Sequence, residues 1–128
     1  MLKLNDLLIE RIDYHDTAEY LVKQYKLRSK VKFGKVKGQN KADYDWVKDV
    51  INLKKSYPSV KEFIITVLHE IKHALDAKKM GKKKYEKAYQ LAGDIAVNKG
   101  KDFHDDNSFE EKAEEYGRKM AVIYLRKK

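Results

Sequence analysis

The chain of 128 residues contains no cysteine and a single proline, Pro58. Without cysteine, disulfides and every thiolate metal site are excluded, so any metal must be held by imidazole and carboxylate groups. The scarcity of proline and the lack of repeats or low-complexity tracts indicate one continuous packed unit. We therefore expect a single domain over residues 1–128, a length sufficient to bury a hydrophobic core.

Long apolar runs are also missing. No stretch approaches the roughly eighteen apolar residues of a membrane span. The first residues, Met1 to Asp6, reach an acid before a signal-like apolar block can form. We therefore expect a protein that is neither exported nor inserted into a membrane, with a cytoplasmic location, and we expect a monomer.

Arginine is scarce: only Arg11, Arg28, Arg118 and Arg126 occur among 29 basic residues, although the formal charge is +9. Such a charge favours acidic partners, including nucleic acid. Lysine lacks the bidentate fork of arginine, so base-specific reading is less well supported than loose attraction. Six lysines form the densest cluster, with little aromatic interleaving for base stacking: Lys78, Lys79, Lys82, Lys83, Lys84 and Lys87. We interpret most of this charge as solvated surface.

The hydrophobic pattern changes period along the chain. Apolar residues after Asp16 follow the helical spacing and predict a helix that ends near Ser29. Between Val31 and Lys55 the pattern is typical of strands separated by turn residues, and we expect three short, mostly antiparallel strands. Three helical patterns follow. The sequence therefore predicts an α+β fold with a small sheet packed on a backing helix.

Capping residues set the bounds of the later helices. Ser59 and Glu62 have the spacing of a capping box, which predicts a long helix from about Val60 to Met80, ended by Gly81. A second helix should carry the apolar residues from Tyr85 to Ala96 and end at Asn98–Gly100. Asn107 or Ser108 should cap the last helix, whose apolar stripe is Phe109, Ala113, Tyr116, Met120, Ile123 and Tyr124.

The sequence His69-Glu70-Ile71-Lys72-His73 lies within the predicted long helix. Residues four apart lie on the same face one turn apart, so His69 and His73 can present two imidazoles to one tetrahedral cation. Glu70 projects beside them, where it can act as general base on a zinc-bound water and later protonate the leaving amine. This HExxH pattern predicts a catalytic zinc site in which Glu70 is the base.

Helical periodicity places the two histidines away from the buried stripe of their helix. That stripe is Phe63, Ile64, Val67, Leu68, Ile71, Ala74 and Leu75. His69 and His73 fall on nearly the opposite face, with Thr66 and Asp76. We therefore expect them to face a cleft or water, and not to be histidines of the core.

A hydrolytic zinc site needs a third protein ligand and an open position. The metzincin extension is absent, because Asp76 and Lys79 stand where glycine and histidine are required. The last helix offers Glu110, on the flank of its apolar stripe, as the best third ligand. Glu114, one turn later, is placed to hydrogen-bond a ligating imidazole. Glu114, His104 and Asp76 remain alternative third ligands.

These residues together resemble a small gluzincin metallopeptidase, most closely the ImmA/IrrE-type and minimal gluzincin peptidases. In those families an E-x-x-A-[D/N/E]-x-[F/Y] pattern follows the HExxH helix, and it matches Glu110, Ala113, Glu114 and Tyr116. The chain departs from the family in carrying an additional helix between His73 and Glu110, and Gly117 stands where alanine is usual.

The resemblance implies a zincin-like fold and zinc-dependent endopeptidase activity on peptides or proteins. It also implies that a strand above the cleft pairs with extended substrate. We predict that Val50, Ile51, Asn52 and Leu53 form this substrate-binding strand, because they lie just before the metal helix. The developing oxyanion requires a donor, for which His104, Tyr57 and Tyr116 are candidates.

A catalytically silent or latent protein with this scaffold is the alternative. In the silent form, the lysine-rich surface would bind nucleic acid or an acidic protein partner. In the latent form, a terminal segment would fill the cleft, and Met1 to Arg11 or Val122 to Lys128 are the candidates.

Overall fold

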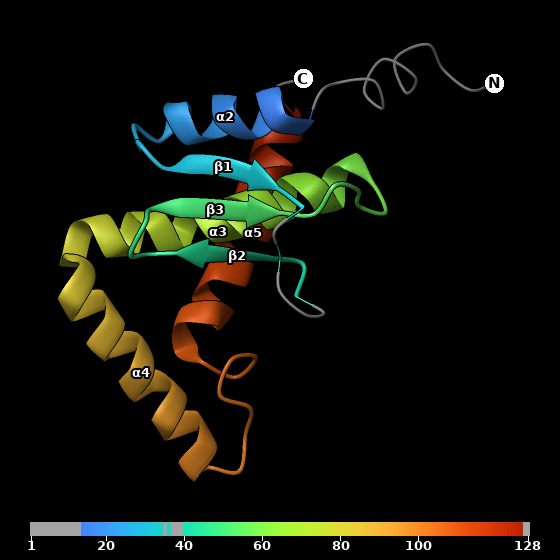
Figure 1. Cartoon of the computed structure of the whole chain (residues 1–128). Coiled ribbons are helices and arrows are strands. Elements are labelled where there is room, and N and C mark those ends of the chain that lie inside the picture. Colours follow the sequence, from blue (N-terminus) through green and yellow to red (C-terminus); the bar gives the residue numbers. More distant parts are fainter. Residues whose placement is uncertain (1–13, 35, 37–39, 127–128) are drawn as a thin grey trace.

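The computed structural model describes residues 14–34, 36 and 40–126. Within this part the fold is α+β, with four helices and a small open sheet of three strands. The elements in chain order are α2 (Tyr14–Gln24), β1 (Lys30–Phe33), β2 (Ala42–Asp45), β3 (Val50–Leu53), α3 (Val60–Met80), α4 (Lys82–Asn98) and α5 (Ser108–Arg126). The sheet covers one side of α3, α5 crosses the other side, and α2 lies beside β1 (Figure 1). None of the described helices is long and apolar enough to cross a membrane.

The sheet is mixed, so the expectation of a mostly antiparallel sheet is wrong. Its strand order is β1-β3-β2, in which β3 pairs parallel with β1 and antiparallel with β2. The chain passes from β1 to the far edge, forms β2, and returns through a tight hairpin to place β3 between them. Alternation of apolar residues indicates a strand but carries no information about its direction, which explains the error.

The prediction that Val50, Ile51, Asn52 and Leu53 bind substrate is also wrong. These residues are β3, and β3 is the central strand, paired on one side with β1 and on the other with β2. A strand whose two edges are both paired has no backbone groups left to bind an extended peptide. The position of β3 just before α3 in the sequence therefore did not reveal its position in the sheet.

The bounds predicted for α3 are confirmed. Ser59 is extended, with φ −156°, and its side chain accepts a hydrogen bond from the backbone N–H of Glu62. At the other end Gly81 has φ +89°, a conformation that glycine adopts without steric cost. The N–H of Gly81 donates to the Ala77 carbonyl, and α4 begins at the next residue. One glycine therefore separates two long helices.

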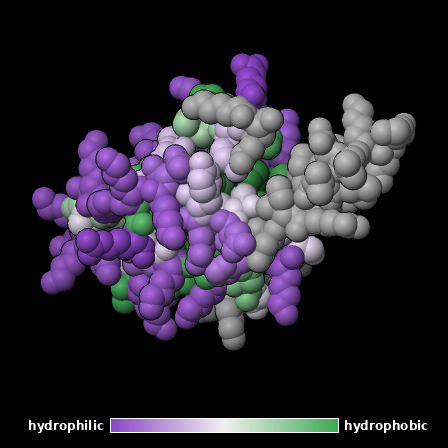
Figure 2. All heavy atoms as spheres, turned by 90° about the horizontal axis from the view of Figure 1, so that it is seen from above, coloured by the Kyte–Doolittle hydropathy of each residue, from purple (hydrophilic) through white to green (hydrophobic). Residues whose placement is uncertain are grey.

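The lysine cluster predicted at the end of α3 lies at this corner. Lys78, Lys79 and the lysines that begin α4 are exposed. The Nζ atom of Lys78 donates to the carbonyl of Lys26, and that of Lys82 donates to the carbonyl of Val47, each at 3.0 Å. Hydrophilic side chains dominate the left of the face in Figure 2, the side on which Figure 1 places the corner between α3 and α4. Most of this charge is therefore exposed surface, as expected.

The closest approach between α3 and α5 occurs at Gly117. Ala113, Gly117 and Ala121 recur every four residues along α5 and are all buried. A Cβ atom on Gly117 would lie 2.7 Å from the backbone carbonyl of Ile65, closer than folded proteins allow. Small residues on this face therefore let the two helix backbones meet. Glu110, two turns before Gly117 on the same face, is brought against α3 as a result.

The Gly117→Ala variant should be less stable than the wild type by about 1–3 kcal/mol, because the added methyl group overpacks the contact with Ile65. This loss should appear although alanine is favoured over glycine within a helix by about 1 kcal/mol. Urea unfolding followed by circular dichroism measures the difference. The matched control is Lys119→Ala, at an exposed position of the same helix. Equal stability of Gly117→Ala and wild type would show that the helices do not meet as described.

Candidate metal centre

His69 and His73 lie on the face of α3 that meets α5. The side chain of His73 is 4% exposed and that of His69 16%. The expectation that both face a cleft or water is therefore correct only for His69, which lines a cleft of about 650 Å³. His73 is buried, because α3 is covered on one side by the sheet and on the other by α5 and α4.

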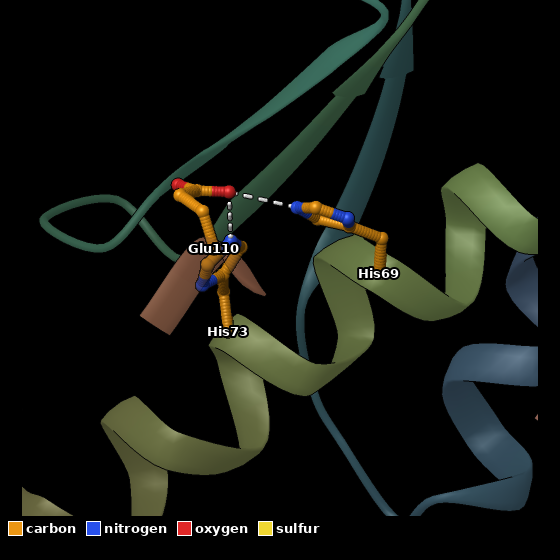
Figure 3. Close-up of side chains that lie close together, drawn as sticks. All are labelled: His69, His73 and Glu110. Atoms are coloured by element: carbon orange, nitrogen blue, oxygen red, sulfur yellow. Dashed lines mark hydrogen bonds and ion pairs between the residues drawn. The ribbon is translucent and has the colours of Figure 1, made fainter. Parts of the chain in front are cut away.

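The side chains of His69, His73 and Glu110 converge on one point (Figure 3). The Nε2 atom of His69 lies 2.8 Å from Oε1 of Glu110, and the Nε2 atom of His73 lies 2.9 Å from the same oxygen. The potential ligand atoms of the three residues all lie within 4.8 Å of one another. Of the four third-ligand candidates, the structure brings Glu110 to both histidines.

Asn107 caps α5, since its Oδ1 accepts a hydrogen bond from the N–H of Phe109 at 2.8 Å. Its Nδ2 also donates to the carbonyl of Tyr89 on α4. Ser108 is therefore not the cap. With Asn107 in that role, Glu110 would lie at the position that could fold back to complete a capping box, yet its carboxylate points to the histidines instead.

The outer nitrogens of the two imidazoles are also held. Nδ1 of His69 lies 3.0 Å from Oε1 of Glu114, the contact expected from the sequence. Nδ1 of His73 lies 2.9 Å from the hydroxyl of Tyr85, which is buried in α4. A partner that accepts a hydrogen bond from Nδ1, as the Glu114 carboxylate does and the Tyr85 hydroxyl can, fixes the ring orientation and favours the tautomer whose Nε2 lone pair is free for a metal. Glu114 is in turn bound by Arg118 at 2.8 Å.

The second oxygen of Glu110 has two further partners. Oε2 accepts a hydrogen bond from the Tyr89 hydroxyl at 2.5 Å and lies 3.2 Å from Nε2 of His104. His104 is thus near the centre but on its exposed side. The loop that carries it is held where Phe103 packs against α4 at Gly93, since a Cβ at Gly93 would overlap the ring.

Sequence reasoning missed Tyr85 and Tyr89. It assigned both to the apolar stripe of α4, where they indeed pack, and so overlooked that their hydroxyls reach His73 and Glu110. Their rings also contact Trp46, at centroid distances of 5.8 and 5.9 Å. The spacing of four residues between them puts two hydroxyls on one helix face, and this was the available signal.

The remaining predicted residues lie elsewhere. Asp76 pairs with Lys72 at 2.9 Å. The hydroxyl of Tyr57 bonds the backbone of Lys41 and Lys54, and the ring of Tyr116 packs against Tyr25. Of the segments proposed to fill the cleft, 122–126 form the end of α5 and do not line it. Residues 1–11 and 127–128 lie outside the described residues.

Glu70 is buried, with 5% of its surface exposed, and it lines both the cleft beside His69 and a cavity of about 120 Å³ beside His73. Within the part of the chain that the structure describes, its carboxylate forms no hydrogen bond or ion pair. Burial raises the pKa of Glu70, since a buried carboxylate loses hydration. Such a group is suited to accept a proton.

Hydrogen bonds couple the charge of Glu110 to the histidines around it. Burial alone would lower the pKa of His69, but its hydrogen bond to Glu110 and the nearby carboxylates raise it to about 9. The hydrogen bond to Glu110 also raises the pKa of His104 to about 9, against a smaller effect of burial. Burial raises the pKa of Glu110, but the hydrogen bonds from three histidines outweigh it and lower this pKa well below its usual range.

The residues present fit a divalent metal. Two neutral imidazoles and one carboxylate are a ligand set used by catalytic zinc, which leaves a further position open. Both Nε2 atoms already point to a single carboxylate oxygen, and each imidazole has a hydrogen-bond partner at its Nδ1 atom. Comparison with known protein families, with curated proteins and with solved structures found no match to this chain. The case for a metal therefore rests on this geometry.

The Glu110→Gln variant should bind zinc more than about 100-fold more weakly than the wild type. Loss of a hydrogen-bond partner of a ligating imidazole already lowers metal affinity roughly 10–100-fold. Here the substitution weakens a proposed ligand itself. Competition with a fluorescent zinc indicator measures the affinity. Glu111→Gln is the matched control, because it removes the same charge one residue later on the exposed side of α5. Equal losses in the two variants would exclude Glu110 as a ligand.

The metal-free protein should lose stability as the pH rises from about 6.5 to 9. The folded state holds the proton of His69 more tightly than the unfolded chain, where the histidine pKa is near 6.5. This proton therefore stabilises the fold fully below pH 6.5, and its contribution disappears as the pH passes 9. His104 acts in the same direction.

Urea unfolding in the presence of a chelator, at pH 6, 7.5 and 9, measures this dependence. Glu110→Gln should flatten it, because that carboxylate is the main group that raises both histidine pKa values. Zinc should reverse the trend, since metal binding requires neutral imidazole and strengthens as protons leave. A stability that rises with pH in the metal-free protein would contradict the assigned coupling.

Proposed function

We propose that this protein is a zinc-dependent endopeptidase of the gluzincin type, with a zincin-like fold. The observation that carries the proposal is the convergence of two imidazole Nε2 atoms on one oxygen of Glu110. A chance HExxH sequence on a solvated helix would not be expected to meet a buried carboxylate from another helix. The proposal also accounts for the alanine of the gluzincin pattern: Ala113 of α5 is fully buried on the face that meets α3.

Zinc at this site would acidify a water molecule and polarise the carbonyl of the peptide to be cleaved. Glu70 is placed to take up the proton that the water loses and to return it to the leaving amine. Its raised pKa makes its carboxylate a stronger base than an exposed glutamate. Glu114 and Tyr85 keep the two imidazoles oriented through their Nδ1 atoms.

We assign the stabilisation of the developing oxyanion to His104. Of the three candidates from the sequence, His104 lines the cleft beside Glu110, whereas Tyr57 and Tyr116 have partners elsewhere. The Nε2 atom of His104 can donate a hydrogen bond to a developing negative charge, and a protonated imidazole is a stronger donor than a neutral one.

The strand that would pair with extended substrate is β2. It lies at one edge of the sheet, and Ala42, with which it begins, lines the cleft together with Asn40 and Lys41. A peptide that added to this edge would run past His69 and Glu70, which lie across the same cleft. Backbone pairing of this kind requires an extended chain and depends little on the side chains of the substrate. The protein would therefore act on unfolded or extended segments of varied sequence.

The Glu70→Gln variant should lose peptide hydrolysis by about 100-fold or more while keeping its zinc. General base catalysis contributes roughly 10²–10⁴-fold, and glutamine cannot accept the proton. Cleavage of casein and of a peptide library by the zinc-loaded protein, read by mass spectrometry, measures the activity. Zinc content per chain is the control.

Zinc bound with no cleavage by either protein would support the alternative of a catalytically silent binding protein. Its exposed lysines at the corner between α3 and α4 would then be tested first, by titration with nucleic acid and with acidic polypeptides. Absence of zinc binding would contradict both.

A further inference from the structure

We propose that the cleft selects polypeptide segments that carry lysine or arginine near the bond to be cleaved. This inference rests on the proposed peptidase function and deepens it by naming a substrate class. It follows from an inversion of charge: the chain as a whole has a formal charge of +9, yet the wall of its cleft is acidic.

Seven carboxylates line the cleft against two permanently basic side chains, Lys41 and Arg118. Two of the seven, Glu70 and Glu110, belong to the metal centre, where the double charge of zinc would balance them. The charge that a substrate meets is therefore set by the other five, which outnumber Lys41 and Arg118 even when the His104 imidazole is protonated. The cleft remains acidic with metal bound.

Three of these carboxylates, which we call the rim carboxylates, have no ion pair among the described residues: Glu62, Glu111 and Glu115. By contrast, Glu114 is paired with Arg118 and His69, and Asp105 lies 3.2 Å from His104. An unpaired carboxylate at the wall of a cleft is free to bind a cation from outside. The rim carboxylates are the groups that would do so.

The rim carboxylates come from both helices that form the metal centre. Glu62 lies two turns before His69 on α3, and both line the cleft. Glu111 and Glu115 lie one turn apart on α5 and continue along the cleft from Glu110. A peptide held along β2 would therefore pass between carboxylates from two helices. Side chains near the scissile bond would therefore meet negative charge.

Glu70 is a second observation that points to a ligand in this cleft. It is 95% buried, since 5% of its surface is exposed, it lines the same cleft, and it has no hydrogen bond within the described residues. A nearly buried carboxylate without a protein partner must be satisfied from the cleft, by water or by a bound ligand. The acidic wall of the cleft thus extends to Glu70, the proposed general base.

Helix electrostatics offers another explanation for part of the pattern. Glu62 and Glu111 lie in the first turns of α3 and α5, where negative charge is favourable. That effect does not extend to Glu115 in the second turn, and it does not explain why all three face one cleft. It predicts a loss of stability on substitution but no change in the choice of peptide, so the two explanations separate experimentally.

The expected effect is modest because the rim carboxylates are partly or fully exposed. Individual exposed ion pairs change an equilibrium by about one- to fivefold, and three acting together should give a preference of roughly tenfold. At 0.15 M salt the Debye length of about 8 Å screens the distant lysines that would repel a basic peptide. Local charge in the cleft should therefore decide the preference.

The test uses the full chain loaded with zinc at 0.15 M salt. Glu70→Gln with zinc is titrated with fluorescent peptides of one sequence whose flanking positions carry either lysine or glutamate, and anisotropy gives the affinity. The same peptides are offered to the wild type, and kcat/KM is measured. We expect about tenfold tighter binding and faster cleavage of the lysine peptide.

Glu111→Lys with Glu115→Lys should abolish or invert this preference. The control is Glu86→Lys on the exposed surface of α4, which adds positive charge away from the cleft and should keep the preference. Glu111→Gln with Glu115→Gln provides a milder variant should the charge reversal unfold the protein, and it should reduce the preference by about half on a logarithmic scale. Zinc content and thermal unfolding verify that each variant is intact.

Equal binding of both peptides, or a preference that survives the rim substitutions, would overturn the inference while leaving peptide hydrolysis standing. Absence of cleavage by the wild type would overturn the proposed function. The binding assay still decides the inference in that case, because it does not depend on hydrolysis.

Discussion

The contact of two helix backbones at Gly117 determines the geometry of the whole site. Because Ala113, Gly117 and Ala121 have little or no side chain, α5 lies directly on α3, and Glu110 reaches the histidines with a short side chain. A glutamate spans only a few ångströms, so a wider helix spacing would separate the carboxylate from both imidazoles. The glycine that departs from the gluzincin pattern is thus explained by packing.

The same contact accounts for the burial of the centre. α3 is covered by the sheet on one side and by α5 on the other, while α4 contributes Tyr85 and Tyr89 from a third direction. Each imidazole is consequently fixed at both nitrogens, and the carboxylate of Glu110 at both oxygens. Orientation of the ligands is therefore built into the packing of three helices and does not depend on a single loop.

Local signals predicted the parts of the fold that depend on local chemistry. The serine cap and Gly81 fixed the bounds of α3, and the positions of Glu110 and Glu114 on their helix face indicated which carboxylates reach the histidines. Strand order and direction depend on contacts between distant segments, so the central place of β3 could not be predicted. The burial of His73 was missed for a related reason, since periodicity identifies one buried stripe and α3 packs on more than one side.

The absence of sulfur from the centre has a consequence for its choice of metal. Two imidazoles and a carboxylate also suit other divalent ions such as cobalt, nickel and manganese, whose raw affinities for such a site follow an intrinsic order. Nothing in this ligand set is as easily oxidised as a thiolate. Any ion bound at this centre would therefore be selected by the geometry of the three residues and by which metals are available.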